Sequence, residues 1–429
     1  MAAALRPVPW RACILIFLAA LLFRLAMVVV TDQIHLFPRK EMVRIAMAFA
    51  DRGELADPFA APTGPTALAP PLYPIFLGMI FRVFGTGVAA EVVKCLLTSA
   101  VSALRWALLP WLAVCLGLRL RAGVIGGILG VFYIGALATD IKGDWAEAYV
   151  ATAILGLFLA AIRIGDSADL TLKTAVSQGV LWGLTVLLSP AAASVLCAFL
   201  LVGAVRFLRT APRQYIRFVA VLGAVAAVVI SPWPVRNQLR LGSPIWSKDN
   251  FGITLLISNH PGAGWDLLSN QEFIETTTPS WIPAVALQLK AVGEVAYDKS
   301  QAEEAKQWIR DNPLTFARLV ALRAFHFWFP PGQNPIHTLL EACLTLCALA
   351  GLYLLYVQHR AAALLILSFW LLYPPLYYIM LWSSRYRYPI NWTLLFTAGV
   401  ALNHLYTLWS ARHAPEHYSD ADRERERAR

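Results

Sequence analysis

The sequence predicts an all-α polytopic membrane protein, and the prediction depends on its composition and on the length of its apolar segments. Of the 429 residues, 58% are hydrophobic and only 14% are charged. Soluble domains carry about 25% charged residues. Apolar runs of roughly 20 residues, the length that spans a bilayer as a helix, recur along the chain. A large soluble core is excluded, because no polar surface would remain to cover so many apolar runs.

Ten segments are predicted to cross the membrane, and basic residues give their direction. The basic linkers at 119–121, 163–173 and 206–217 and the tail from Arg412 all fall on one side, which the positive-inside rule makes the cytoplasm. Ser189-Pro190 interrupts the run 175–207, which we therefore count as two short helices. The ten predicted spans are 12–31, 89–118, 123–139, 146–164, 175–188, 190–207, 215–233, 336–357, 361–382 and 389–410.

Two larger segments then lie outside the membrane. Residues 32–88 form the first outer loop, in which 41–53 is predicted to be an amphipathic helix on the membrane surface. The apolar run 70–85 is predicted to be an interfacial or re-entrant helix. Residues 234–335 form a small outer domain with helices at 285–312 and 314–327, separated by Asn312-Pro313. The predicted parts are an N-terminal membrane module (1–233), this outer domain, C-terminal membrane helices (336–411) and a charged cytoplasmic tail (412–429).

The charge and the cysteines exclude several other classes of protein. The net charge is +10, but residues 234–335 contain nine basic and nine acidic residues, so the excess lies at the ends of the membrane segments. This distribution reports membrane topology, and nucleic acid is not an expected partner. All six cysteines lie in apolar segments, where they act as small core residues. We therefore expect no disulfide framework, no structural zinc and no other metal site.

The first outer loop carries the first candidate site. Lys40, Glu41 and Arg44 lie on the polar face of the predicted helix. Basic residues in an outer loop oppose the positive-inside trend, so they either contact lipid headgroups or hold a lipid-linked phosphate beside a carboxylate. A carboxylate in this place could remove a proton from a sugar hydroxyl. Tyr73 follows in a proline-rich stretch, Pro70 to Pro74, that enters the next helix.

Two further outer connections carry charged residues. Asp144 and Glu147 lie between the third and fourth spans, where Asp144 would cap a helix and Glu147 would lie one turn inside the membrane. The last connection reads Ser-Arg-Tyr-Arg-Tyr-Pro, with Arg385, Tyr386 and Arg387. In an extended chain both guanidinium groups would lie on one face, which favours an anion site over a simple interfacial anchor.

Taken in order, these segments resemble the bacterial GT-C glycosyltransferases related to protein O-mannosyltransferases and aminoarabinose transferases, the glycosyltransferase family thirty-nine type. The family has an acidic residue where this chain has Pro38 and Arg39, which leaves Glu41 as the nearest carboxylate. The matching segments are Glu41 to Gly53, Pro70 to Pro74, Pro232 to Asn237 with Gly242, Asn259 to Pro261, Ala305 to Pro313 with Arg323, Phe327-Trp328, and Arg385 to Pro389.

The resemblance implies a GT-C-like bundle of about ten transmembrane helices and a sugar transferase that needs no cofactor. The donor would be a polyprenyl-phosphate-linked sugar and the acceptor a lipid, glycan or protein at the extracytoplasmic face of a bacterial inner membrane. Membrane lipids would be its surroundings. A flippase for lipid-linked sugars and a non-catalytic membrane subunit remain alternatives. The candidate catalytic residues are Glu41, then Glu147 and Asp144, and the candidate substrate-binding residues are Lys40, Arg44, Tyr73, Arg385, Tyr386 and Arg387.

Overall fold

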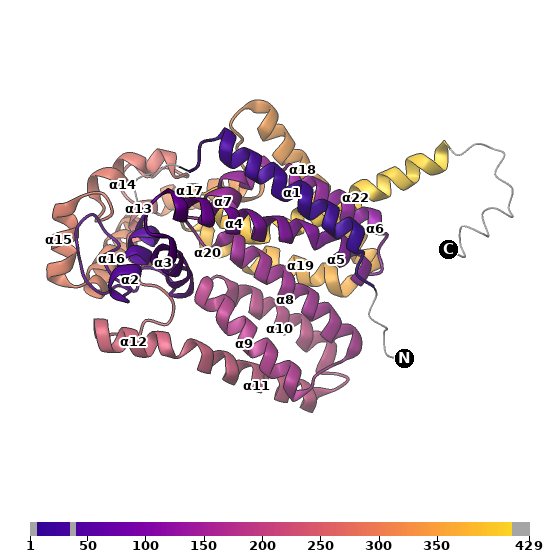
Figure 1. The fold of residues 1–429 in the computed structure, drawn as a ribbon, viewed down its shortest axis with the longest axis horizontal. Helices are drawn as coiled ribbons and strands as arrows, with labels where there is room; N and C mark the ends of the chain where they lie inside the picture. Colours follow the sequence, from indigo (N-terminus) through magenta and orange to yellow (C-terminus); the bar gives the residue numbers. More distant parts are fainter. Residues whose placement is uncertain (1–6, 35–39, 414–429) are drawn as a thin grey trace.

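The protein, seen in a computed structural model, is described over residues 7–34 and 40–413, and its regular elements in those ranges are helices. Strand-like pairing within them is limited to two isolated bridges, Ala56 with Pro65 and Asp266 with Trp382. Figure 1 shows a bundle of long helices and, at one end of it, a cluster of shorter helices formed by α2, α3 and α13 to α16. The predicted all-α class is confirmed.

The bundle contains the apolar helices. Six of its helical segments are long and apolar enough to cross a membrane, or seven if the pair 120–131 and 134–142, bent by 57°, is one span. The chain is therefore a multi-pass membrane protein. The bundle consists of α1 (Trp10–Val30), α4 (Val88–Ala107), α5 (Leu109–Cys115), α6 (Leu120–Val131), α7 (Leu137–Lys142), α8 (Glu147–Ser167), α9 (Leu172–Leu188), α10 (Ala192–Phe207), α11 (Pro212–Ile230), α18 (Pro335–Gln358), α19 (Arg360–Leu372) and α22 (Asn391–Arg412).

Each of the ten predicted spans contains a helix, but three of them, in addition to the bent pair, differ from an ordinary span. Helices α9 and α10 have 17 and 16 residues, so they are short for the membrane. Helix α22 has 22 residues but is not apolar enough to count as a span by composition, and its first half is buried inside the protein. A Cβ atom on Gly351 of α18 would lie 1.7 Å from the Thr397 carbonyl oxygen of α22, so the two helices pack backbone to backbone.

The cluster at the end of the bundle contains most of the segments that we predict to lie outside the membrane. Gly293, with φ of 95°, divides the predicted helix 285–312 into two, because a backbone in that region leaves the helical conformation. The remaining helices are α2 (Glu41–Arg52), α3 (Leu72–Phe84), α12 (Pro232–Leu241), α13 (Phe251–Ser258), α14 (Gln271–Thr277), α15 (Pro283–Val292), α16 (Glu294–Asp311), α17 (Pro313–Trp328), α20 (Pro375–Tyr378) and α21 (Ser384–Arg387). Of these, α12 continues the apolar segment of α11 and α20 continues that of α19.

Helix α2 forms where the sequence predicts it and ends at Gly53, which adopts the left-handed conformation with φ of 70°. Its apolar residues Met42, Ile45 and Ala46 are at most 5% exposed. Helix α3 covers part of this face closely, since a Cβ on Gly78 would lie 2.7 Å from the Ala46 carbonyl oxygen. The prediction that this apolar face lies on the membrane surface is therefore wrong, because the protein itself buries it.

The first outer loop and the outer domain are joined by buried hydrogen bonds. The Glu294 carboxylate accepts hydrogen bonds from the Thr66 hydroxyl at 2.5 Å and the Ala67 amide at 2.7 Å. Arg236 of α12 donates to the carbonyl oxygens of Leu55 and Thr66, at 2.7 and 2.8 Å. The two outer segments, far apart in the sequence, therefore form one connected layer over the bundle.

A buried charge network holds the outer ends of several bundle helices. Arg24 of α1 donates to the Asp140 carboxylate at 2.6 Å, and Arg105 of α4 donates to its other oxygen at 2.9 Å. The Tyr388 hydroxyl donates to the same carboxylate. These three charged side chains are fully buried. Charges inside a bundle persist only when they are paired, so this network fixes the position of α7 and of the connection after it.

Candidate functional site

The connection between α7 and α8 forms the floor of the candidate site. It begins at Gly143, where φ is 64° and a Cβ would lie 2.4 Å from the Thr98 hydroxyl, so both the conformation and the space require glycine. The Tyr73 hydroxyl donates to the Gly143 carbonyl oxygen at 2.5 Å. Tyr73 is only 1% exposed, so its hydroxyl supports this turn. This contact differs from the substrate contact that we predicted for Tyr73.

Asp144, the next residue, is held between lysines from two other elements. The Lys94 ammonium of α4 lies 2.7 Å from one oxygen of the Asp144 carboxylate, and Lys40, just before α2, lies 3.8 Å from the other. Lys94 also pairs with Glu91 at 2.6 Å. Asp144 therefore ties the first outer loop to the bundle.

Glu147 and Arg385, 238 residues apart in the sequence, form the central ion pair. Arg385 of α21 donates through Nε at 3.0 Å and Nη2 at 2.7 Å, both to Glu147 Oε1. Its guanidinium lies 3.7 Å from the centre of the Trp145 ring, a stacking that suits arginine. The second oxygen, Glu147 Oε2, is buried and has no hydrogen-bond partner among the described residues.

Arg387 has different partners from Arg385. Residues 384–387 form a helical turn, in which residues two positions apart do not face each other. Arg387 donates to Glu341 of α18 at 2.7 Å and to the Tyr133 hydroxyl at 2.6 Å. The prediction that both guanidinium groups lie on one face is therefore wrong, because it assumed an extended chain.

Lys248 is a residue that the sequence analysis missed. It is accessible to solvent but closely surrounded by protein, and this loss of hydration lowers its pKa to about 8. The nearby Arg385 lowers the pKa further, while Glu147 opposes the effect. Desolvation also lowers the pKa of Lys40, against the attraction of Asp144. Lys40, Lys248 and Arg385, which we call the cation cluster, thus converge from three segments.

The sequence feature that could have drawn attention to Lys248 is the motif that precedes it. The Trp233 indole donates to the Ser247 carbonyl oxygen at 2.8 Å, and the Asn237 amide donates to that of Ile245 at 2.8 Å. These two side chains of α12 hold the loop that carries Lys248. The motif Pro232 to Asn237 was part of the resemblance, but no sequence pattern marked the lysine itself.

The remaining predicted residues divide into two groups. Glu41, in the first turn of α2, acts electrostatically on both Lys40 and Arg385. Tyr386 stacks on Tyr377 with ring centres 4.6 Å apart. Arg44 instead donates to backbone carbonyl oxygens in the outer layer, including that of Ser280 at 3.1 Å. The structure thus brings together Lys40, Glu41, Asp144, Glu147, Arg385 and Tyr386, and gives Arg44, Tyr73 and Arg387 other partners.

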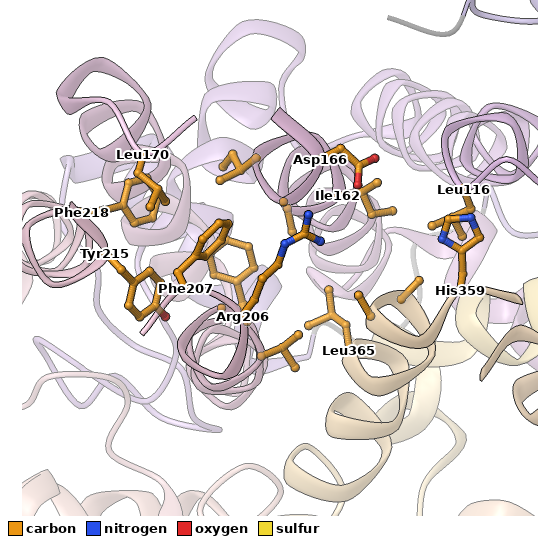
Figure 2. Close-up of a pocket in the computed structure, with 18 residues that line it drawn as sticks. Leu116, Ile162, Asp166, Leu170, Arg206, Phe207, Tyr215, Phe218, His359 and Leu365 are labelled. Atoms are coloured by element: carbon orange, nitrogen blue, oxygen red, sulfur yellow. The ribbon is translucent and has the colours of Figure 1, made fainter. Parts of the chain in front are cut away.

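A largely apolar pocket of about 80 Å³ lies away from this site, at the far end of α8, between α8, α10, α11 and α19. Figure 2 shows Arg206, Asp166 and His359 among its mostly apolar side chains. None of the predicted site residues lines it. Elsewhere in the described ranges, no three or more His, Cys, Asp or Glu side chains are grouped so that they could hold a metal ion.

Comparisons with known proteins agree on the fold. Neither a family model nor a curated protein matches the sequence. The archaeal oligosaccharyltransferase AglB from Archaeoglobus fulgidus, in complex with an inhibitory peptide and a dolichol-phosphate, aligns with a TM-score of 0.52 and 14% identity. The apo form of the oligosaccharyltransferase from the same organism aligns with a TM-score of 0.53 and 16% identity. The chain has a GT-C-like fold.

The alignment covers 95% and 96% of this chain but only 52% and 53% of those two structures, so the chain spans about half of their length. The GT-C-like fold predicted from the ordered motifs is therefore confirmed. The finer assignment to the glycosyltransferase family thirty-nine type stays a prediction. The same holds for the predicted division of the chain into domains.

Proposed function

We propose that this GT-C-like protein is a membrane glycosyltransferase that moves a sugar from a polyprenyl-phosphate-linked donor to a lipid, glycan or protein acceptor on the extracytoplasmic side. The cation cluster beside three carboxylates, at the outer end of a multi-pass bundle, carries this proposal. Arg385 repels both Lys40 and Lys248, and a bound phosphate would relieve that repulsion. One of the solved structures of similar fold is in complex with a dolichol-phosphate, which is a lipid of this class.

The chemistry divides between the two kinds of charge. A polyprenyl phosphate is already a good leaving group, so the reaction needs cations for the developing phosphate charge and a base for the acceptor hydroxyl. We assign the phosphate to the cation cluster. We assign the base to Glu41, which lies beside Lys40 and Arg385 in the first turn of α2. Glu147 orients Arg385, and Asp144 orients Lys40 and Lys94.

Glu147 is the second candidate for the base. Its Oε2 atom has no hydrogen-bond partner in the described part of the chain, so this oxygen could accept a proton while Oε1 stays paired with Arg385. The two assignments predict different effects of removing each carboxylate.

The proposed function is tested with the purified full chain in lipid nanodiscs. The chain is incubated with a panel of polyprenyl-phosphate sugars, and transfer to added acceptors and hydrolysis of the donor are measured. We expect turnover with at least one donor, and its loss in Arg385→Ala. No turnover across the panel, together with measurable flipping of the donor lipid, would instead identify a flippase.

A further inference from the structure

A second polar cavity, of about 210 Å³, lies beside the segment 133–139, the first turns of α18 and the start of α22. Glu341, His337, Arg387 and Asn391 are among the residues that line it. A single water occupies roughly 30 Å³, so the cavity is too large for one structural water.

Helix α21 separates this cavity from the cation cluster. Arg385 of α21 reaches Glu147, whereas Arg387, two residues later, reaches Glu341. Residues at this spacing on a helical turn point in different directions. One short helix therefore contributes an arginine to each of two polar sites.

The cavity carries no uncompensated positive charge near Arg387. The Arg387 guanidinium donates to the Glu341 carboxylate at 2.7 Å, to the Tyr133 hydroxyl at 2.6 Å and to the Trp328 carbonyl oxygen at 3.3 Å. The side chains of Arg387 and Glu341 are 5% and 4% exposed. Unlike Arg385, near which Lys40 and Lys248 lie, Arg387 is neutralised by Glu341 and bonded on several sides. An anion would therefore gain little here, and the cavity suits an uncharged ligand.

The lining includes a buried acceptor without a partner. Asn391 is only 3% exposed, and its Oδ1 atom has no hydrogen-bond partner among the described residues. Buried polar groups in folded proteins are nearly always hydrogen-bonded, so the amide of this lining residue, whose oxygen is unpaired, is available to a ligand in the cavity. The hydroxyls of Ser384 and Thr139 add further donors and acceptors to the same lining.

The lining also includes Trp382, a residue whose ring combines an apolar face with a polar edge. A sugar ring has the matching character, with apolar C–H faces and a rim of hydroxyls. From the compensated charge, the unpaired oxygen and the aromatic ring, we infer that this cavity binds an uncharged saccharide unit. The source of that unit, the acceptor glycan or the sugar of the donor, rests on the proposed function.

The test uses Asn391→Leu in the full chain. Removing an unpaired buried oxygen should leave the thermal stability unchanged or higher, whereas removing a bonded one lowers it. The probe is a panel of neutral methyl glycosides, whose binding is measured by saturation-transfer NMR in nanodiscs. We expect at least one glycoside to bind the unsubstituted protein, and its affinity to fall about tenfold in Asn391→Leu, which corresponds to one lost hydrogen bond.

Asn403→Leu is the matched control. Asn403 lies on the same helix, α22, and its Oδ1 is also buried without a partner, but it does not line the cavity. It should bind the glycoside like the unsubstituted protein. No binding by any glycoside, or equal binding by Asn391→Leu and the unsubstituted protein, would overturn the inference.

Turnover experiments then identify the source of the sugar. If Asn391→Leu raises the KM for the acceptor, the cavity holds the acceptor glycan, and if it raises the KM for the donor, the cavity holds the transferred sugar. Both results support a saccharide site. Glycoside binding does not require turnover, so a failure of the proposed glycosyltransferase function would be seen separately from a failure of this inference.

Discussion

The protonation state of Lys248 can be followed by measuring donor binding as a function of pH. Its pKa of about 8 means that its ammonium group is charged below this pH and becomes neutral above it. We expect donor affinity to fall as the pH rises from 7 to 9, because a neutral amine no longer attracts phosphate. Lys248→Arg should remove this fall, because arginine keeps its charge throughout that range.

The measurement is the Kd for the polyprenyl-phosphate sugar at each pH, in nanodiscs of uncharged lipid. Lys248→Met should bind about tenfold more weakly at pH 7, since it removes one charge-assisted contact. Lys306→Arg is the control, because Lys306 is exposed and pairs with Glu303, which is not part of the site. An unchanged alkaline fall in Lys248→Arg would contradict this role for Lys248.

Variants of Glu41, Glu147 and Arg385 should differ in their effects on donor binding and on turnover. Glu41→Gln keeps the shape of the side chain but cannot accept a proton, so turnover should fall by about 10²–10⁴-fold while donor binding persists. Arg385→Ala should weaken both, because it removes charge from the ground state and the transition state. Steady-state kinetics and a donor-binding assay on each variant provide the measurement.

Glu54→Gln is the matched control for Glu41→Gln, since Glu54 is an exposed carboxylate that follows α2 and pairs with Arg240 at 3.0 Å. It should retain normal kinetics. If Glu41→Gln is nearly normal and Glu147→Gln is inactive, the base is Glu147. Normal kinetics in both would rule out the carboxylate scheme.

At the scale of elements, helix α12 should control the site through the loop it holds. Asn237→Ala removes the hydrogen bond to the Ile245 carbonyl oxygen and should loosen the loop that carries Lys248. Donor affinity should therefore fall, and the loss should not add to that of Lys248→Met, because both changes act through one contact. Gln238→Ala, on the exposed side of the same helix, should have no effect. Full additivity in the double variant would contradict this coupling.

The α7–α8 connection is positioned by the buried network around Asp140. Asp140→Asn would leave Arg24 and Arg105 buried without a counter-charge, which costs about 3–5 kcal/mol when one partner of a buried pair is lost. We expect a clear fall in the apparent Tm in detergent. Asp166→Asn, at the exposed end of α8, should leave the Tm unchanged. An unaltered Tm in Asp140→Asn would mean that the network carries little of the stability.

Helix α21 shows what local sequence could and could not predict about an element. Its tyrosine and its two arginines were recognised as a candidate site from the residue types alone. Their directions depend on whether the segment is extended or helical, and four residues contain too little periodicity to decide this. In the folded protein the segment is a helical turn, from which Arg385 reaches Glu147 of α8 and Arg387 reaches Glu341 of α18.

At the scale of the whole molecule, the orientation in the membrane is a prediction that cysteine labelling tests. The outer layer around Ser269 should react with a membrane-impermeant reagent in intact cells, while Thr210, between α10 and α11 beside the basic linker, should not. Single cysteines at these two exposed positions, in a background without the native cysteines, give the matched pair. If only the Thr210→Cys variant is labelled, the orientation in the membrane is the reverse of the predicted one. Ser419, in the predicted cytoplasmic tail, lies outside the described residues.

The sequence by itself determined the membrane class, the places of most helices and the order of the motifs that resemble GT-C enzymes. Apolar run length, proline and glycine are local signals, so they were sufficient for α2, which ends at Gly53, and for α17, which begins at Pro313. The charged residues of three outer connections were also recognised as one set of candidates before their positions in space were known.

Only the tertiary structure decided which of those residues meet. Arg385 pairs with Glu147 across 238 residues, and Lys248 reaches the same place from a loop with no distinctive pattern of its own. The apolar face of α2, which by periodicity alone suits either lipid or protein, is covered by protein. Periodicity states that one face of a helix is buried, but the partner is selected by long-range packing, which no local pattern encodes.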